Sequence, residues 1–169
     1  MSAMNTPISP DSESARQLLR HALATLAYRG GKAVRGAPDD FAAFRAGETS
    51  RTAGQILAHV GDLLDWAVSL VIGKQAWHDS ESLPWPQGVN RFFAALAALD
   101  ASLASGAPLG APAEKIFQGP IADAFTHIGQ ISMLRRLAGY PVKGENYLRA
   151  DIAAGRIGPD QLPPKREFD

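Results

Sequence analysis

Three side chains that can bind a metal ion interrupt the apolar stripes of this sequence: His59, Asp123 and His127. Asp123 and His127 are four residues apart, so in a helix they lie one turn apart on the same face. His59 lies between Ile56 and Leu63, at steps of three and four residues, and therefore also points inward. Such groups can either bind a divalent cation or satisfy one another through hydrogen bonds. The spacing alone favours a hydrogen-bonded network, or a pairing with nearby arginines.

The elements that must position these residues are helices, because apolar residues recur at helical spacing and no period-two strand pattern appears. Gly30-Gly31, Gly73 and Gly139 are expected to end helices, and Gly119-Pro120 is expected to break or kink one. We expect four helices, at about residues 11–29, 52–72, 89–105 and 114–138, with a loop from residue 77 to 88. The fold class predicted is all-α, an up-down-up-down four-helix bundle with an irregular C-terminal tail.

The chain divides into three predicted regions. Residues 1–10 form a disordered lead, residues 11–141 the bundle, and residues 142–169 a tail packed on the bundle. We expect Tyr147 and Phe168 to pin the tail against the helices. At 169 residues, of which 46% are hydrophobic and 20% charged, the chain has the length and composition of one globular domain.

Composition excludes several classes of function. Lys plus Arg and Asp plus Glu are equal at 17 each, so no net charge attracts the chain to nucleic acid or to anionic membrane. The chain has no cysteine, which excludes disulfides, iron–sulfur ligation and a cysteine nucleophile. Charged residues and a histidine interrupt the most apolar window, residues 56–72, and the N-terminus lacks a signal-peptide pattern. We expect a soluble, cytoplasmic protein with no nucleic-acid or membrane partner.

Two stretches of the sequence resemble the helix signatures of the DinB/YfiT-like superfamily. They are Thr52–Val60, with the sequence TAGQILAHV, and Thr126–Gly139, with THIGQ followed by LRRLAG. The resemblance spans residues 14–139 and implies a four-helix bundle that binds a divalent cation. Family members use one histidine of the second helix and an H-x3-H pair of the fourth. His59 matches the first of these ligands and His127 the last.

Asp123 departs from the family pattern, because it stands where the family commonly has histidine. A carboxylate is still a competent ligand, and two histidines plus one carboxylate recur in zinc and non-haem iron sites. The resemblance makes a metal site, rather than a hydrogen-bonded network, the favoured interpretation of His59, Asp123 and His127. Zinc or nickel is the expected ion, with iron or manganese as alternatives.

The resemblance also implies chemistry. The superfamily includes bacillithiol S-transferases and a mycothiol-dependent maleylpyruvate isomerase, so we expect a thiol S-transferase or a related hydrolase or isomerase. A metal-activated thiolate or water would be the nucleophile, and the substrate a small molecule, including a low-molecular-weight thiol. Homodimers are common in such bundles, and we expect one here. The alternative is a non-catalytic binding or interaction protein with a vestigial metal site. In that case Asp123, in place of the family's usual histidine, would indicate that the site has drifted from its original function.

The remaining polar residues are weaker candidates for a functional role. Asp62 and Asp65 are expected on the solvated edge of their helix, and His78 in a solvated loop. His21 is expected at the partly exposed edge of the core. Gln130 lies near His127 in sequence and can either orient a metal ligand or make an ordinary interhelical hydrogen bond.

Overall fold

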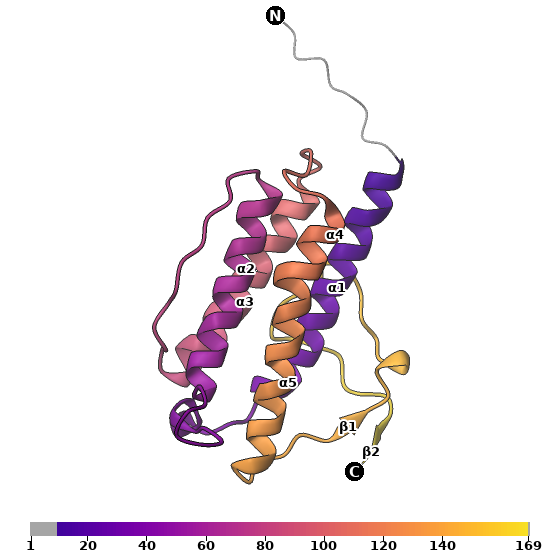
Figure 1. Cartoon of the computed structure of the whole chain (residues 1–169). Helices are drawn as coiled ribbons and strands as arrows, with labels where there is room; N and C mark the ends of the chain where they lie inside the picture. Colours follow the sequence, from indigo (N-terminus) through magenta and orange to yellow (C-terminus); the bar gives the residue numbers. More distant parts are fainter. Residues whose placement is uncertain (1–9, 169) are drawn as a thin grey trace, which may run out of the picture.

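The long helices form a four-helix bundle over residues 10–168, the part of the chain that this computed structural model describes (Figure 1). This confirms the all-α fold predicted from the sequence. The first three helices are α1 (Pro10–Val34), α2 (Ala53–Val71) and α3 (Trp85–Ala104). The fourth is a composite of α4 (Ala113–Ile116), the π-helical segment η2 (Phe117–Ile121) and α5 (Ala122–Leu137). A short 3-10 helix, η1 (Asp39–Ala43), lies between α1 and α2.

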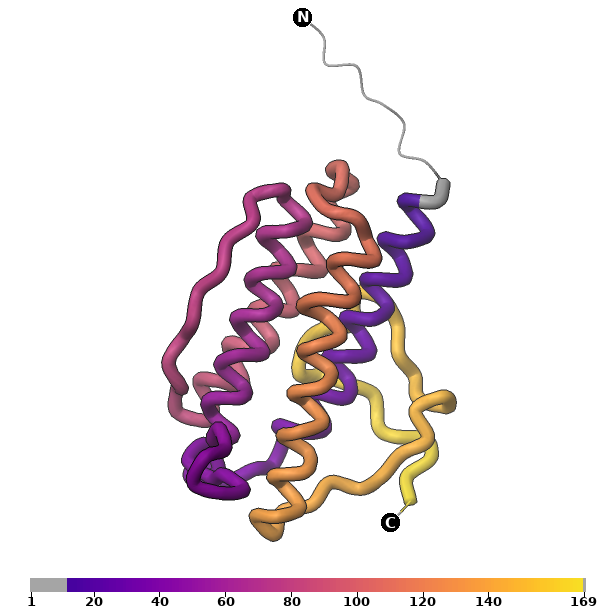
Figure 2. The backbone as a smooth tube through the Cα atoms, in the orientation of Figure 1, coloured from indigo at the N-terminus to yellow at the C-terminus, as the bar shows by residue number. Residues whose placement is uncertain are grey.

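The up-down-up-down order predicted from the sequence is wrong, because α2 and α3 run in the same direction. α2 and α3 are parallel, because Arg91 in the second turn of α3 donates to the carbonyl of Ala58 in the second turn of α2. Both helices run upward in Figures 1 and 2, whereas α1 and α5 run downward. The physical reason is the connection, residues 72–84, which returns along the outside of α2. The 19 residues of α2 span about 28 Å, and a dozen extended residues reach about 40 Å.

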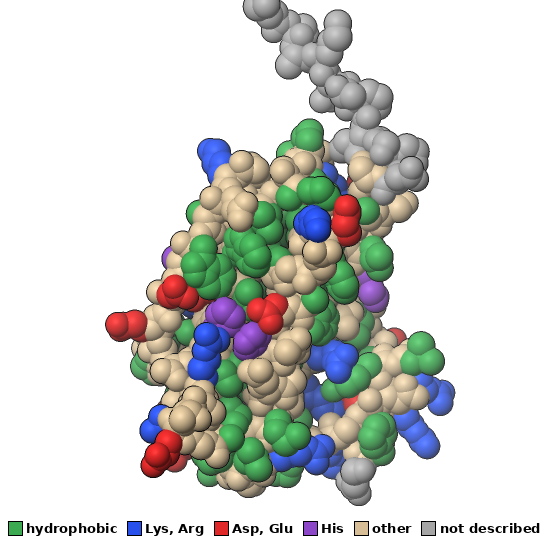
Figure 3. All heavy atoms as spheres, in the orientation of Figure 1, with side chains coloured by type: hydrophobic (Ala, Val, Ile, Leu, Met, Phe, Trp, Pro, Cys, Tyr) green, Lys and Arg blue, Asp and Glu red, His purple; other side chains and the backbone are tan. Residues whose placement is uncertain are grey.

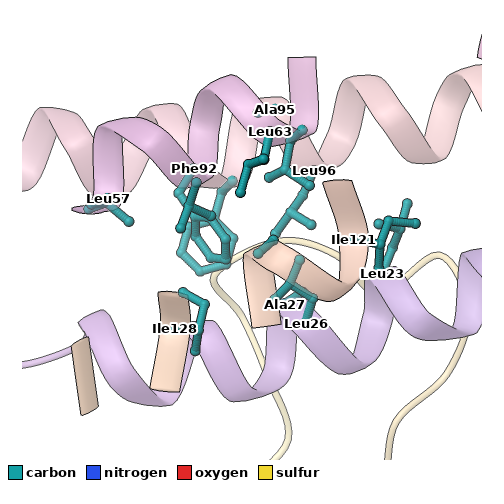
Figure 4. Close-up of a cluster of buried hydrophobic side chains, with 14 of the residues drawn as sticks. Leu23, Leu26, Ala27, Leu57, Leu63, Phe92, Ala95, Leu96, Ile121 and Ile128 are labelled. Carbon is teal, nitrogen blue, oxygen red and sulfur yellow. The ribbon is translucent and has the colours of Figure 1, made fainter. Parts of the chain in front are cut away.

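The core lies at the centre of the bundle, where all four helices contribute side chains. Around the bundle, α1 contacts α3 and α5, and α2 contacts the same two helices. Figure 4 shows Leu26 of α1, Leu63 of α2, Phe92 of α3 and Ile128 of α5 as members of one cluster of buried hydrophobic side chains. All four side chains are buried. Burying an aliphatic or aromatic side chain contributes about 1.5–3 kcal/mol, so this core holds the site-bearing helices α2 and α5 in place.

Two helix ends differ from the prediction. α1 continues through Gly30-Gly31 to Val34, and Gly36, at φ 71°, follows its end. Gly30 permits close packing rather than stopping the helix, because a Cβ there would lie 2.5 Å from Cζ of Phe92. α3 begins at Trp85, earlier than expected, with Pro86 in its first turn, where the missing N–H of proline costs nothing.

Replacing Gly30 with alanine tests this close approach. We expect Gly30→Ala to lower the free energy of unfolding by about 1–3 kcal/mol, because Phe92 must move to admit the methyl group. Gly129→Ala is the matched control, since a Cβ on this exposed helical glycine meets nothing within 4 Å. The control should stabilise the protein by up to about 1 kcal/mol. Urea unfolding that gives the two variants the same stability would contradict this packing.

The tail forms a small structure of its own against α1. Strand β1 (Gly144–Glu145) pairs antiparallel with β2 (Glu167–Phe168), although the sequence predicted no strand. The buried carboxylate of Glu145 accepts hydrogen bonds from Tyr28 Oη at 2.6 Å and from Lys32 Nζ at 2.8 Å. Tyr147, in the 3-10 helix η3 (Tyr147–Arg149), stacks edge-on against Tyr28, which confirms its predicted role. Phe168 is more than half exposed and lies against Gly144 of the same tail, so its predicted contact with the bundle stays a prediction.

The lead predicted for residues 1–10 lies, except for Pro10, outside the residues that the structure describes. Between residues 10 and 168, no helix is both long and apolar enough to cross a membrane.

Candidate metal centre

Two regular helices present the three predicted residues. His59 lies in the second turn of α2, whose start is fixed by a capping box between Thr52 and Gln55. Asp123 and His127 lie on α5, directly after the π-helical segment that contains Pro120. Proline lacks the N–H needed for regular helical bonding, and the wider π turn accommodates it. Because α5 is regular again from Ala122, the four-residue spacing places Asp123 and His127 on one face, as predicted.

The three side chains converge between α2 and α5. His59 Nε2 lies 3.7 Å from Asp123 Oδ2, and His127 Nδ1 lies 3.2 Å from Asp123 Oδ1. The two imidazole rings are 4.7 Å apart between centroids. Each residue offers one ligand atom within 4.8 Å of the others. Figure 3 shows histidine side chains beside an acidic one on this face of the molecule.

A backbone hydrogen bond orients His127. Its Nδ1 lies 2.8 Å from the carbonyl oxygen of Asp123. Since a carbonyl only accepts, Nδ1 must carry the proton and donate it, which leaves the lone pair on Nε2. A ring N–H held by a backbone carbonyl is the usual second interaction of a metal-bound histidine. The helix therefore orients the ring of His127 so that Nε2 is the nitrogen available to a metal ion.

The surroundings of His59 favour its neutral form. Burial lowers the pKa of the His59 imidazole, and the nearby His127 and Arg51 lower it further, against the opposite effect of Asp123 and Asp62. A metal ligand must be deprotonated. His59 is thus held in the protonation state that can donate its lone pair to a cation.

The gap between His59 and Asp123 fits a metal ion better than a hydrogen bond. A contact of 3.7 Å is too long for a hydrogen bond. Within residues 10–168, neither ring nitrogen of His59 has a hydrogen-bond partner. Two ligand atoms on a tetrahedral zinc, each about 2.1 Å from the ion, are separated by about 3.4 Å. A small movement of either side chain would bring both atoms into that geometry.

An aromatic side chain from the 72–84 connection, Trp77, covers one side of the site. The Trp77 ring lies edge-on to His59, with centroids 5.7 Å apart, and also to Trp66 of α2, at 5.9 Å. Trp77 could not be assigned to the site from the sequence, because no periodic pattern links a residue of an irregular segment to the helix beside it. The site therefore has an apolar wall next to its imidazole ligand.

A second group of metal-binding residue types, Asp62, Asp65 and His78, lies nearby, and the sequence prediction for Asp62 is wrong. Asp62 is buried rather than solvated, and its carboxylate accepts from Ser80 N at 2.8 Å and from Ser80 Oγ at 2.7 Å. His78 is half exposed but lies 3.2 Å from Asp65 Oδ2. Asp62 and His78 meet because the long connection runs beside α2, a path that local spacing does not reveal.

The cation of this second group is an arginine. Arg91 Nη2 lies 2.7 Å from Asp62 Oδ1 and 2.9 Å from Asp65 Oδ2. Gly61 leaves room for the guanidinium, because a Cβ there would collide with Arg91 Nη1. Burial alone would raise the pKa of Asp62, but the bonds from Ser80 and Arg91 outweigh it and lower the pKa. This cluster fastens the 72–84 connection, and with it Trp77, to α2 and α3.

The other predicted candidates lie outside the cluster of three. His21 is exposed on α1 and lines a different groove, between α1 and the composite fourth helix. Gln130 is exposed and lines a groove together with His127. Arg51, which the sequence reasoning did not single out, lines the same groove and acts electrostatically on His59. Its position just before the helix cap Thr52 was the only available signal.

Comparison with known protein families, with curated proteins and with solved structures finds no match. The resemblance to the DinB/YfiT-like superfamily accordingly stays a prediction from the sequence.

Proposed function

We propose that this chain binds one divalent metal ion through His59, Asp123 and His127, and that it is a metal-dependent enzyme. In this proposal it is a thiol S-transferase, or a related hydrolase or isomerase, of the kind found in the DinB/YfiT-like superfamily. The observation that carries the proposal is the convergence of two imidazoles and a carboxylate across an interhelical gap of 3.7 Å. One imidazole is oriented by a carbonyl, and the other has no hydrogen-bond partner within residues 10–168.

Three protein ligands are the number found in catalytic zinc sites, which keep a further position open for water or substrate. A bound divalent ion lowers the pKa of a water or thiol at that position and so supplies a nucleophile at neutral pH. Asp123 is the most open of the three residues, with 45% of its side chain exposed, against 19% for His59 and 12% for His127. Asp123 is therefore the most solvent-accessible of the three residues, while Trp77 lies against His59.

Substitutions of Asp123 test whether its carboxylate is a ligand. Asp123→His supplies a third imidazole, the common set in the superfamily that the sequence resembles, and should retain metal within about 10-fold of wild-type affinity. Asp123→Asn keeps the shape but loses the charge, and should bind more weakly than Asp123→His because a neutral amide oxygen attracts a dication less. Metal affinity is measured by competition titration. The reverse order of the two affinities would show that Asp123 does not ligate the ion.

A further inference from the structure

A groove of about 470 Å³ begins at the metal centre, with His127 in its wall. It lies between α5 and the segment that leads into α2. This volume is within the usual range of small-molecule sites. A larger groove, lined by Leu18 and Phe117, contains none of the three candidate ligands. The groove beside His127 is therefore the one from which a bound molecule can reach the metal centre.

One part of this groove is apolar. Its apolar walls are made by Ala46, Ile56, Met133, Leu134 and Leu137. Met133 and Leu137 are more than half exposed to solvent, although large apolar side chains gain free energy when they leave water. A hydrocarbon chain lying along α5 would cover both of them.

The polar part of the groove carries an unpaired positive charge. Ser50, Arg51 and Gln130 line it. In the part of the chain that the structure describes, the Arg51 guanidinium has no hydrogen bond and no ion pair. Arg45 and Arg91, by contrast, donate to Glu48 O and Asp62. Arg51 lines the same groove as His127, so its charge lies on the side of the metal centre from which this groove is open.

From this arrangement we infer the substrate class: a small molecule with an apolar body and an anionic group, a carboxylate being the simplest. The apolar body lies against Met133 and Leu137, the anionic group pairs with Arg51, and the reacting group reaches the ion held by His127 and its partners. A guanidinium binds a carboxylate through paired hydrogen bonds, which makes Arg51 a specificity-determining residue. The inference rests on the proposed function, because the metal centre defines where the reacting group lies.

The test compares two thiols that differ only at their far end, 6-mercaptohexanoate and 6-mercaptohexanol. Each is titrated into protein saturated with Co²⁺, where thiolate ligation to cobalt is followed by near-ultraviolet absorption. We expect wild type to bind the acid more tightly than the alcohol. Arg51→Gln should weaken the binding of the acid roughly 3- to 10-fold. The effect is modest because Arg51 is exposed and its pairing is partly screened. The alcohol should bind the variant and wild type equally.

Arg136→Gln is the matched control, because Arg136 is an exposed arginine of α5 that does not line the groove. It should leave the affinities of both thiols unchanged. The inference would be overturned if Arg51→Gln lost the same affinity for acid and alcohol, or if wild type did not prefer the acid. Neither result would contradict the metal centre. Failure of wild type to bind Co²⁺ would instead overturn the proposed function, and this inference with it.

Discussion

Loss of either imidazole at the centre is expected to abolish stoichiometric metal binding. His59→Ala and His127→Ala each remove one of three ligands that meet between α2 and α5. Removing a partner that only orients a ligand costs roughly 10- to 100-fold in metal affinity, so we expect more than about 100-fold for a ligand itself. Metal content after dialysis and competition titration measure the loss.

Two controls separate this site from other histidines of the chain. His21→Ala should bind metal like wild type, because His21 is exposed on α1 and belongs to no metal-binding group among residues 10–168. His78→Ala should also keep the ion, because Arg91 already supplies the positive charge between Asp62 and Asp65. Loss of metal in His78→Ala with retention in His59→Ala would move the site to the Asp62 cluster.

The second large effect concerns stability. Asp62→Ala should lower the free energy of unfolding by about 2–4 kcal/mol, because it leaves Ser80 and the partly buried Arg91 without the carboxylate that they share. Asp65→Ala is the matched control: its carboxylate is more exposed and pairs with the same arginine. That change should cost less than about 1 kcal/mol. Urea unfolding at pH 7 measures both, and equal losses would contradict the buried role of Asp62.

The contribution of Asp62 should also depend on pH. Its pKa in the folded protein is lowered from the ordinary aspartate value of 3.8, so the unfolded chain takes up the proton first as the pH falls. The stabilisation is therefore fully present above the unfolded pKa and is lost as the pH falls through the folded pKa. The difference in stability between wild type and Asp62→Ala should be constant from pH 7 to about pH 5 and should shrink below about pH 3.8. A difference that grows in acid would contradict the lowered pKa.

The parts of this structure that the sequence predicted are those that depend on local spacing. The apolar stripe around His59 and the four-residue step from Asp123 to His127 indicated which helix faces turn inward, and the structure brings these three residues together. Pro120 correctly indicated an irregularity in the last helix. These features follow from helical periodicity and backbone chemistry, which operate within a few residues.

The parts that the sequence did not predict depend on contacts between distant segments. From the sequence, Gly30 is expected to end a helix. In the structure a glycine is needed inside the helix at this position, because Phe92 of another helix packs against it. Asp62 reads as a solvated residue, because its partners Ser80 and Arg91 lie 18 and 29 positions further along the chain. The parallel direction of α3 depends on the path of the 72–84 connection, which has no periodicity of its own.

The most direct test of the central claim is a cobalt titration of the tag-free wild-type protein, followed by visible absorption. We expect one Co²⁺ per chain, with an intense spectrum typical of four-coordinate cobalt that changes when azide is added, because azide takes the open position. We expect His127→Ala to give neither the spectrum nor its change. A wild-type protein that binds no Co²⁺ at equimolar concentration, or whose cobalt spectrum is the same in His127→Ala, would contradict a metal centre at His59, Asp123 and His127.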